Sequence, residues 1–153
     1  AEPCLERIDE RVANLARPPS SFQELVQVLR YREGQVYGAH LDWSNRLNYG
    51  RNLPKMEQSK GTYENRMATV FWYLSDVDGG GETHFPRAGG LPPPSSNKGC
   101  VGGGIKVKPR RGRGIVFYSL TPDGMGDTLA VHAACAPAPG QTKWAANKWV
   151  HNA

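Results

Sequence analysis

Arg66–Leu74, with the sequence RMATVFWYL, is the most strongly strand-forming segment of this chain. It is apolar almost throughout and rich in β-branched and aromatic residues, a pattern typical of a strand that is buried on both faces. We therefore expect it at the centre of a β-sheet. The chain of 153 residues contains 18 Gly and 12 Pro, a content that favours many turns over long helices.

Shorter segments with strand patterns lie on both sides of this strand, separated by turn residues. They are Leu25–Tyr31, Gln35–Trp43, Glu82–Phe85, Ile105–Lys108, Gly114–Ser119, Thr128–His132 and Lys143–His151. Many short strands at such spacing predict a mainly β fold, either a sandwich or a barrel. Before them, apolar residues recur with helical period over Pro3–Ala16 and predict an N-terminal helix. The length predicts a single domain over residues 1–153.

Two segments are not expected to form regular structure over their full length. Ser44–Tyr63 is polar and contains turn residues, so it is predicted to be a loop. Gly79–Gly104 contains nine Gly and four Pro in 26 residues, and only Glu82–Phe85 within it has a strand pattern. The sequence assigns no specific role to residues 86–104 beyond a flexible flap.

Positive charge is concentrated in Ile105–Arg113, where five of nine residues are basic, in a chain with a net charge of +5. Ile105 and Val107 alternate with lysines, and Pro109 and Gly112 mark a turn, which favours a solvated hairpin. No aromatic residues interleave with the basic ones, as they do where proteins stack nucleic-acid bases. We therefore expect no nucleic-acid partner. No stretch of about 18 apolar residues occurs, so no membrane-spanning helix is expected.

The sharpest local motif is His40-Leu41-Asp42. Residues two apart on a strand point to the same face, so this histidine and carboxylate can bind one ion. With His132 they form the two-His-one-carboxylate set of non-haem Fe(II) oxygenases. His84 and His151 are alternative third ligands by composition, and an isolated H-x-D motif also occurs by chance.

The chain has a longer ordered series of motifs. YREGQVYGAHLD covers residues 31–42, RMATVFWYLSDVDGGGETHFP covers 66–86, GDTLAVHAAC covers 126–135 and KWAANKWVH covers 143–151. This series resembles the catalytic domain of prolyl 4-hydroxylases, members of the Fe(II)/2-oxoglutarate dioxygenase superfamily, over about residues 5–152. The resemblance implies a double-stranded β-helix, or jelly roll, with a supporting N-terminal helix.

The resemblance also implies roles for individual residues. His40, Asp42 and His132 match the iron ligands. Lys143 matches the lysine that pairs with the distal carboxylate of 2-oxoglutarate, and Tyr31 and Thr69 match residues of the same pocket. Tyr37, Trp149 and His151 match positions that line the groove for a proline-rich peptide in the polyproline II conformation.

One spacing departs from the family pattern. Ten residues, Ala133–Thr142, separate His132 from Lys143, where the family usually has nine. An extra residue within a strand would turn Lys143 to the opposite face of the sheet. Because Pro137, Pro139 and Gly140 lie in this interval, we expect a turn to absorb the extra residue.

Cys100 and Cys135 resemble a family pair that can form a disulfide, which would leave Cys4 unpaired. A disulfide would imply an oxidising compartment, and we expect the secretory pathway or the lumen of the endoplasmic reticulum. No targeting segment is visible at the first residues, and the sequence does not define an oligomeric state.

The activity implied is 4-hydroxylation of peptidyl proline with Fe(II), 2-oxoglutarate, O2 and ascorbate. Two alternatives remain open. One is a dioxygenase of the same superfamily that acts on another substrate, such as a peptidyl lysine or a nucleic-acid base. The other is a non-catalytic jelly-roll module that binds proline-rich chains.

Overall fold

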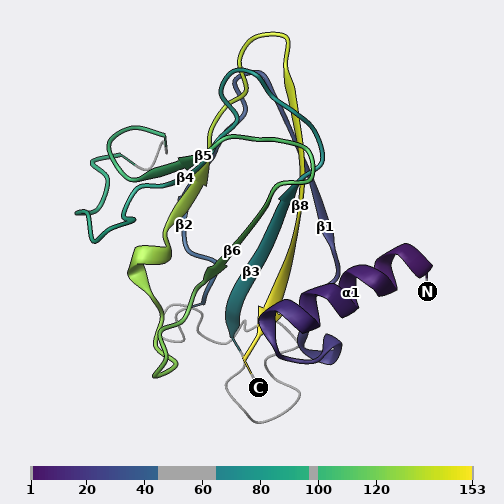
Figure 1. Cartoon of the computed structure of the whole chain (residues 1–153). Coiled ribbons are helices and arrows are strands. Elements are labelled where there is room, and N and C mark those ends of the chain that lie inside the picture. The colour runs from purple at the N-terminus through teal and green to yellow at the C-terminus, as the bar shows by residue number, and fades with distance from the viewer. Residues whose placement is uncertain (1, 45–64, 97–99, 153) are drawn as a thin grey trace, which may run out of the picture.

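Two antiparallel β-sheets and one N-terminal α-helix make up the computed structural model, which describes residues 2–44, 65–96 and 100–152 (Figure 1). The first four-stranded sheet, here called sheet A, has the order β1 (Gln27–Arg32), β8 (Thr142–His151), β3 (Arg66–Tyr73) and β6 (Gly114–Tyr118). The second, sheet B, has the order β2 (Tyr37–His40), β7 (His132–Ala134), β4 (Thr83–Phe85) and β5 (Ile105–Val107). The predicted mainly β, jelly-roll-like fold is confirmed.

The strand predicted from Arg66–Leu74 is an inner strand of sheet A, because β3 pairs with β8 on one side and with β6 on the other. Its side chains alternate between two environments. Ala68 and Val70 belong to the apolar cluster on the outer face of sheet A, whereas Thr69 and Phe71 line a cavity on its inner face. The apolar run is therefore explained by burial on both faces.

The predicted helix is confirmed as α1 (Pro3–Ala16), and it covers the outer face of sheet A (Figure 1). Val12 and Ala16 pack in one cluster with Ala68, Val70 and Val150. An ion pair of 2.6 Å between Lys148 Nζ on β8 and Asp9 Oδ1 on the helix adds a polar contact. A short 3-10 helix, η1 (Ser20–Phe22), then leads the chain towards β1.

The prediction of a strand over Thr128–His132 is wrong at its start. Thr128–Ala130 forms a 3-10 helix, η2, and the strand β7 begins at His132. The cause is local, since the Asp127 carboxylate accepts a hydrogen bond of 2.7 Å from the backbone N–H of Leu129. This side-chain cap favours a helical turn.

The prediction of a hairpin around Ile105–Arg113 is also wrong. Its two strands form, but β5 pairs with β4 in sheet B and β6 pairs with β3 in sheet A. The basic segment between them therefore crosses from one sheet to the other. Backbone bonds fix this crossing, because Gly112 N–H donates to the Tyr73 carbonyl and Tyr73 N–H donates to the Arg113 carbonyl.

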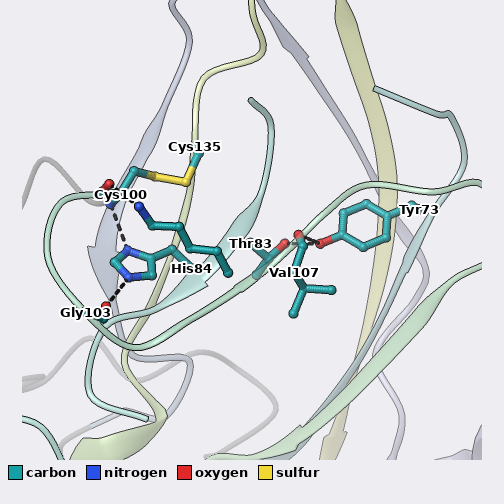
Figure 2. Close-up of a disulfide and its surroundings, with 8 residues drawn as sticks. Tyr73, Thr83, His84, Cys100, Gly103, Val107 and Cys135 are labelled. Atoms are coloured by element: carbon teal, nitrogen blue, oxygen red, sulfur yellow. Dashed lines mark hydrogen bonds between the residues drawn. A yellow bond between two sulfur atoms is a disulfide. The ribbon is translucent and has the colours of Figure 1, made fainter. Parts of the chain in front are cut away.

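A disulfide between Cys100 and Cys135 ties the Gly- and Pro-rich connection to the residue that follows β7 (Figure 2). The buried ring of His84 lies beside it. His84 Nδ1 accepts from the Cys100 backbone N–H at 3.0 Å, and Nε2 donates to the Gly103 carbonyl at 2.7 Å. The disulfide implied by the family resemblance is thus present, and the free Cys4 is exposed.

A second contact in Figure 2 joins the two sheets. The Tyr73 hydroxyl on β3 lies 2.7 Å from Thr83 Oγ1 on β4 and 2.9 Å from the Val107 carbonyl on β5. The loop predicted over Ser44–Tyr63 lies, apart from Ser44, outside the described residues. None of the helices in the described part of the chain has the length and apolar character that a membrane crossing needs.

Candidate metal centre and adjoining cavity

His40, Asp42 and His132 come together at one end of sheet B. His40 is the last residue of β2 and pairs with His132, the first residue of β7. Asp42 lies two residues beyond His40, and the ligand atoms of all three side chains lie within 4.8 Å of one another. His40 Nε2 is 3.6 Å from Asp42 Oδ1, and His132 Nε2 is 3.7 Å from Asp42 Oδ2.

Backbone carbonyls fix the orientation of both imidazole rings. His40 Nδ1 lies 2.8 Å from the Gly38 carbonyl oxygen, and His132 Nδ1 lies 3.1 Å from the Ala130 carbonyl oxygen. A carbonyl can only accept, so both Nδ1 atoms donate. In the neutral rings, Nε2 then offers its lone pair towards Asp42, which is the arrangement that metal-binding histidines use.

The Asp42 carboxylate and the His132 ring are both buried. Thr69 Oγ1 donates a hydrogen bond of 2.6 Å to Asp42 Oδ2, which fixes the carboxylate plane. Burial lowers the pKa of His132, the nearby His40 lowers it further, and Asp42 opposes both effects. The histidine is thereby kept in the neutral form that binds a metal.

A cavity of about 370 Å³ lies between the two sheets and adjoins the three ligands. β8 lines it with alternate residues, among them Lys143, Asn147 and Trp149, and β1 contributes Tyr31. Tyr31 is the register partner of Lys143 in the β1–β8 pair. The structure thus brings Lys143, Tyr31, Thr69 and the three candidate ligands to one cavity.

The extra residue between His132 and Lys143 lies outside the strands. β7 ends at Ala134 and β8 begins at Thr142. Between them, Gly140 adopts a positive φ of 74° and Gln141 N–H donates to the Ala138 carbonyl, which is a turn. Lys143 therefore keeps its inward direction, as the sequence predicted.

The Lys143 ammonium is fully buried, and its Nζ has no hydrogen-bond partner among the described residues. Burial lowers the pKa of Lys143 to about 8, although Glu82 opposes this shift electrostatically. Burial also raises the pKa of Tyr31. An unpaired buried cation is costly, so this end of the cavity suits an anionic group.

The rim of the cavity is aromatic. Tyr37 is half exposed, and its ring centre lies 4.0 Å from that of His40. The Arg66 guanidinium lies over the ring of Trp149 at 3.5 Å, a cation–π contact. Glu24 accepts from Arg66 Nε at 2.6 Å and from Arg66 Nη2 at 3.1 Å, which holds the guanidinium in place.

His151 does not line this cavity. It is buried behind the rim, where its Nε2 donates a hydrogen bond of 2.9 Å to Glu24 Oε1. Burial would raise the pKa of Glu24, but the hydrogen bonds from His151 and Arg66 outweigh it and lower that pKa to about 2. His151 thus contacts the rim through Glu24 and Arg66.

Sequence reasoning missed Glu24, Arg66 and Asn147. Glu24 precedes β1, and nothing in its local sequence indicates its partners, because they come from β3 and β8. In the sequence, Arg66 is marked only as the first residue of the predicted strand Arg66–Leu74. Asn147 could have been found, since a polar residue four positions after Lys143 on one strand faces the same side.

The donor set fits iron with a 2-oxo acid cosubstrate. Two imidazole nitrogens and one carboxylate oxygen are the facial set that binds non-haem Fe(II) and leaves positions open. The unpartnered Lys143 ammonium at the same cavity supplies a counter-charge for a carboxylate. No residue in this arrangement needs to act as a nucleophile.

The fold and this site define an oxygenase of the jelly-roll type, and the sequence comparison agrees. Residues 26–151 match the 2OG-Fe(II) oxygenase superfamily, and the chain belongs to this family. Probable prolyl 4-hydroxylase 9 of Arabidopsis thaliana is 37% identical over 97% of this chain and 48% of its own length. Prolyl 4-hydroxylase 13 of the same plant is 37% identical over 97% and 50%, respectively.

A comparison with solved structures also finds similar prolyl hydroxylases. The viral collagen prolyl hydroxylase of Paramecium bursaria Chlorella virus-1, in complex with 2-oxoglutarate, has a TM-score of 0.67 and 26% identity. The match covers 97% of this chain and 73% of the viral one. The chain spans about half the length of the curated relatives that it matches.

Proposed function

We propose that this chain is the catalytic domain of a peptidyl-proline 4-hydroxylase that uses Fe(II), 2-oxoglutarate and O2. The observation that carries the proposal is the unpartnered, buried Lys143 ammonium in the same cavity as the His40, Asp42 and His132 ligand atoms. An iron-binding triad alone fits many oxygenases. The added lysine fits a dicarboxylate cosubstrate, and the relatives named above support proline as the target.

In this proposal the three ligands would hold iron, and Lys143 with Tyr31 would hold the far carboxylate of 2-oxoglutarate. Iron and 2-oxoglutarate held there would supply the oxidising chemistry, in which decarboxylation of 2-oxoglutarate to succinate and CO2 would be coupled to insertion of one O2 oxygen into the proline C4–H bond. Thr69 orients Asp42 through its hydrogen bond of 2.6 Å. The apolar and aromatic walls exclude water from the reacting groups.

The proposed substrate is a proline-rich peptide in an extended polyproline II conformation. Tyr37 and Trp149 line the same cavity as the metal ligands, and aromatic-lined grooves recognise this conformation. Arg66 adds donors at the rim that can reach peptide carbonyls. His151 supports this rim indirectly, by its bond to Glu24.

We also propose an oxidising compartment, the secretory pathway or the lumen of the endoplasmic reticulum. The Cys100–Cys135 disulfide supports it, because such bonds persist where thiols are not kept reduced. Ascorbate is the proposed reductant that restores Fe(II) after uncoupled turnover.

The test is turnover by the purified protein with Fe(II), 2-oxoglutarate, ascorbate, O2 and a panel of proline-rich peptides. Mass spectrometry reports oxygen gained by the peptide, and succinate is measured in parallel. Asp42→Asn and His132→Ala, which remove iron ligands, are the control variants. We expect the wild-type protein to add oxygen to proline, and we expect both variants to lose this activity.

Two other outcomes would revise the proposal. Succinate formed without peptide oxidation would keep the dioxygenase and direct the search to other substrates. Bound iron without either product would indicate a non-catalytic module that binds proline-rich chains.

A further inference from the structure

Asn147 is a buried polar residue in the cavity for which neither the metal ligands nor the lysine supply a partner. It lies on β8, is 3% exposed and lines the cavity. Its amide nitrogen Nδ2 and its oxygen Oδ1 both lack a hydrogen-bond partner among the described residues. A side chain that can donate two hydrogen bonds and accept two is thus left without any.

The β8 register locates Asn147 between the two ends of the cavity. It shares a face of the strand with Lys143, four residues before it, and with Trp149, two residues after it. On the neighbouring strand β3, Phe71 pairs with Asn147 and Thr69 pairs with Trp149. Because Thr69 is bonded to the ligand Asp42, Asn147 lies along the strand between Lys143 and the level of the metal ligands.

The described residues around Asn147 leave both polar atoms of its amide without a hydrogen-bond partner. Leaving a buried polar group unpaired costs stability, whereas an apolar side chain at the same place costs none. The inward side chain two residues before it on β8 is Ala145, and its neighbour on β3, Phe71, is apolar. Its neighbour on β1, Gln27, is polar and lines the same cavity, but it makes no hydrogen bond with the Asn147 amide. The missing partner is therefore expected from the molecule that fills the cavity, as for Lys143.

We propose that Asn147 is a further positioning residue for the cosubstrate, whose amide binds the 2-oxo acid end of 2-oxoglutarate while Lys143 pairs with the far carboxylate. This inference rests on the proposed function. The Nδ2 hydrogens can donate to the oxygens of that end. Oδ1 can accept from a water or hydroxyl in the cavity, which an ammonium such as that of Lys143 cannot do.

The test measures 2-oxoglutarate binding directly, by calorimetry on Fe(II)-loaded protein under nitrogen and without peptide. Asn147→Leu removes both polar atoms and keeps a similar branched shape, and Asn147→Ala avoids any overpacking. Trp144→Phe is the matched control, because Trp144 lies on the same strand and is 40% exposed. Fe(II) affinity and thermal unfolding are measured for every variant.

Loss of a hydrogen bond to a charged oxygen is expected to weaken 2-oxoglutarate binding roughly 10- to 100-fold in both Asn147 variants. Fe(II) affinity stays unchanged, and Asn147→Leu unfolds at the wild-type temperature or above it. In turnover, the KM for 2-oxoglutarate rises while the KM for peptide does not. Trp144→Phe behaves as wild type in all of these measurements.

Wild-type 2-oxoglutarate affinity in both Asn147 variants would overturn the assignment. So would a large loss of thermal stability in both, because it would mean that the amide serves the fold. If the wild-type protein binds iron but no 2-oxoglutarate, the proposed function itself fails, which this design distinguishes from a failure at Asn147 alone.

Discussion

Tyr31 and Lys143 face each other across the β1–β8 pair, and the Lys143 ammonium nitrogen lies 5.2 Å from the centre of the Tyr31 ring. The same nitrogen lies 5.5 Å from the ring centres of both Phe71 and Tyr73. Three aromatic rings thus surround a cation whose Nζ has no hydrogen-bond partner in the described part of the chain. Ring faces offset only part of the lost hydration.

This burial predicts an unusual pH dependence of stability. The pKa of Lys143 falls from 10.5 to about 8 in the folded protein, so between these values the unfolded chain binds the extra proton. Stability therefore rises as the pH increases through this window. A shift of this size corresponds to roughly 3 kcal/mol. Lys143→Met removes the titrating group and should abolish this rise.

Denaturant unfolding of both proteins without cosubstrate, from pH 7 to pH 10.5, is the measurement. The free-energy advantage of Lys143→Met should be greatest at pH 7 and shrink as the pH approaches 10.5. Other titrating groups are common to both proteins and cancel in the difference. A difference that does not depend on pH would show that the buried lysine keeps an ordinary pKa.

A second prediction concerns Thr69, which should control the affinity for Fe(II) although it binds no metal itself. Its hydroxyl is bonded to Asp42 Oδ2 at 2.6 Å, so Thr69→Val leaves the carboxylate without its orienting donor. We expect Fe(II) affinity to fall about 10- to 100-fold, as is typical for the loss of such a partner. Calorimetric titration with Fe(II) under nitrogen, without 2-oxoglutarate, measures this.

Thr69→Ser is the matched control because it keeps the hydroxyl. Its Fe(II) affinity should stay near that of the wild-type protein. Equal affinities in the Val and Ser variants would mean that the Asp42 carboxylate is held well enough by other contacts.

The strands could be predicted because their signals are local. The strand pattern of Lys143–His151 and the apolar run of Arg66–Leu74 are each visible within ten residues of sequence. The errors arose where one side chain or a distant strand decides the conformation. The Asp127 cap produced η2, and pairing with two different sheets separated β5 from β6.

The residues of the site divide in the same way, into those that a local sequence pattern indicates and those that only the tertiary structure brings together. The His40-Leu41-Asp42 motif and the Lys143 segment are short and ordered, so the sequence could indicate them. The Glu24–Arg66–His151 cluster joins residues that lie 42 and 127 positions from Glu24 in the chain. No periodicity in the sequence reports such a contact, which depends on the tertiary arrangement of β3 and β8 around the segment before β1.

The Cys100–Cys135 disulfide should contribute stability chiefly by restricting the unfolded chain. The bond joins residues 35 positions apart, for which the chain-entropy estimate gives about 3–4 kcal/mol. Cys100→Ser combined with Cys135→Ser should lower the free energy of unfolding by that amount in denaturant titrations. The hydrogen bond that the Cys100 N–H donates to the buried His84 ring, and the one that His84 donates to the Gly103 carbonyl, should weaken as well.

Cys4→Ser is the control, since Cys4 is exposed and unpaired. It should unfold as the wild-type protein does. Adding a reductant should lower the stability of the wild-type and Cys4→Ser proteins but leave the double variant unchanged. A double variant as stable as the wild type would mean that the loop is held by its other contacts alone.

His151 is expected to affect peptide binding from behind the cavity rim. It donates to Glu24, which in turn holds the Arg66 guanidinium over Trp149. His151→Phe removes this donor and should loosen Arg66, so the KM for a proline-rich peptide should rise at least several-fold. Because Lys143 and the metal ligands are untouched, the KM for 2-oxoglutarate should not change.

Arg66→Lys separates charge from geometry at the same rim. Lysine keeps the positive charge but cannot form the two-point contact that Arg66 makes with Glu24. If the ordered guanidinium is what the peptide needs, Arg66→Lys and His151→Phe should raise the peptide KM alike, and the double variant should add little. Independent, additive effects would instead mean that His151 acts on the peptide by a route that bypasses Arg66.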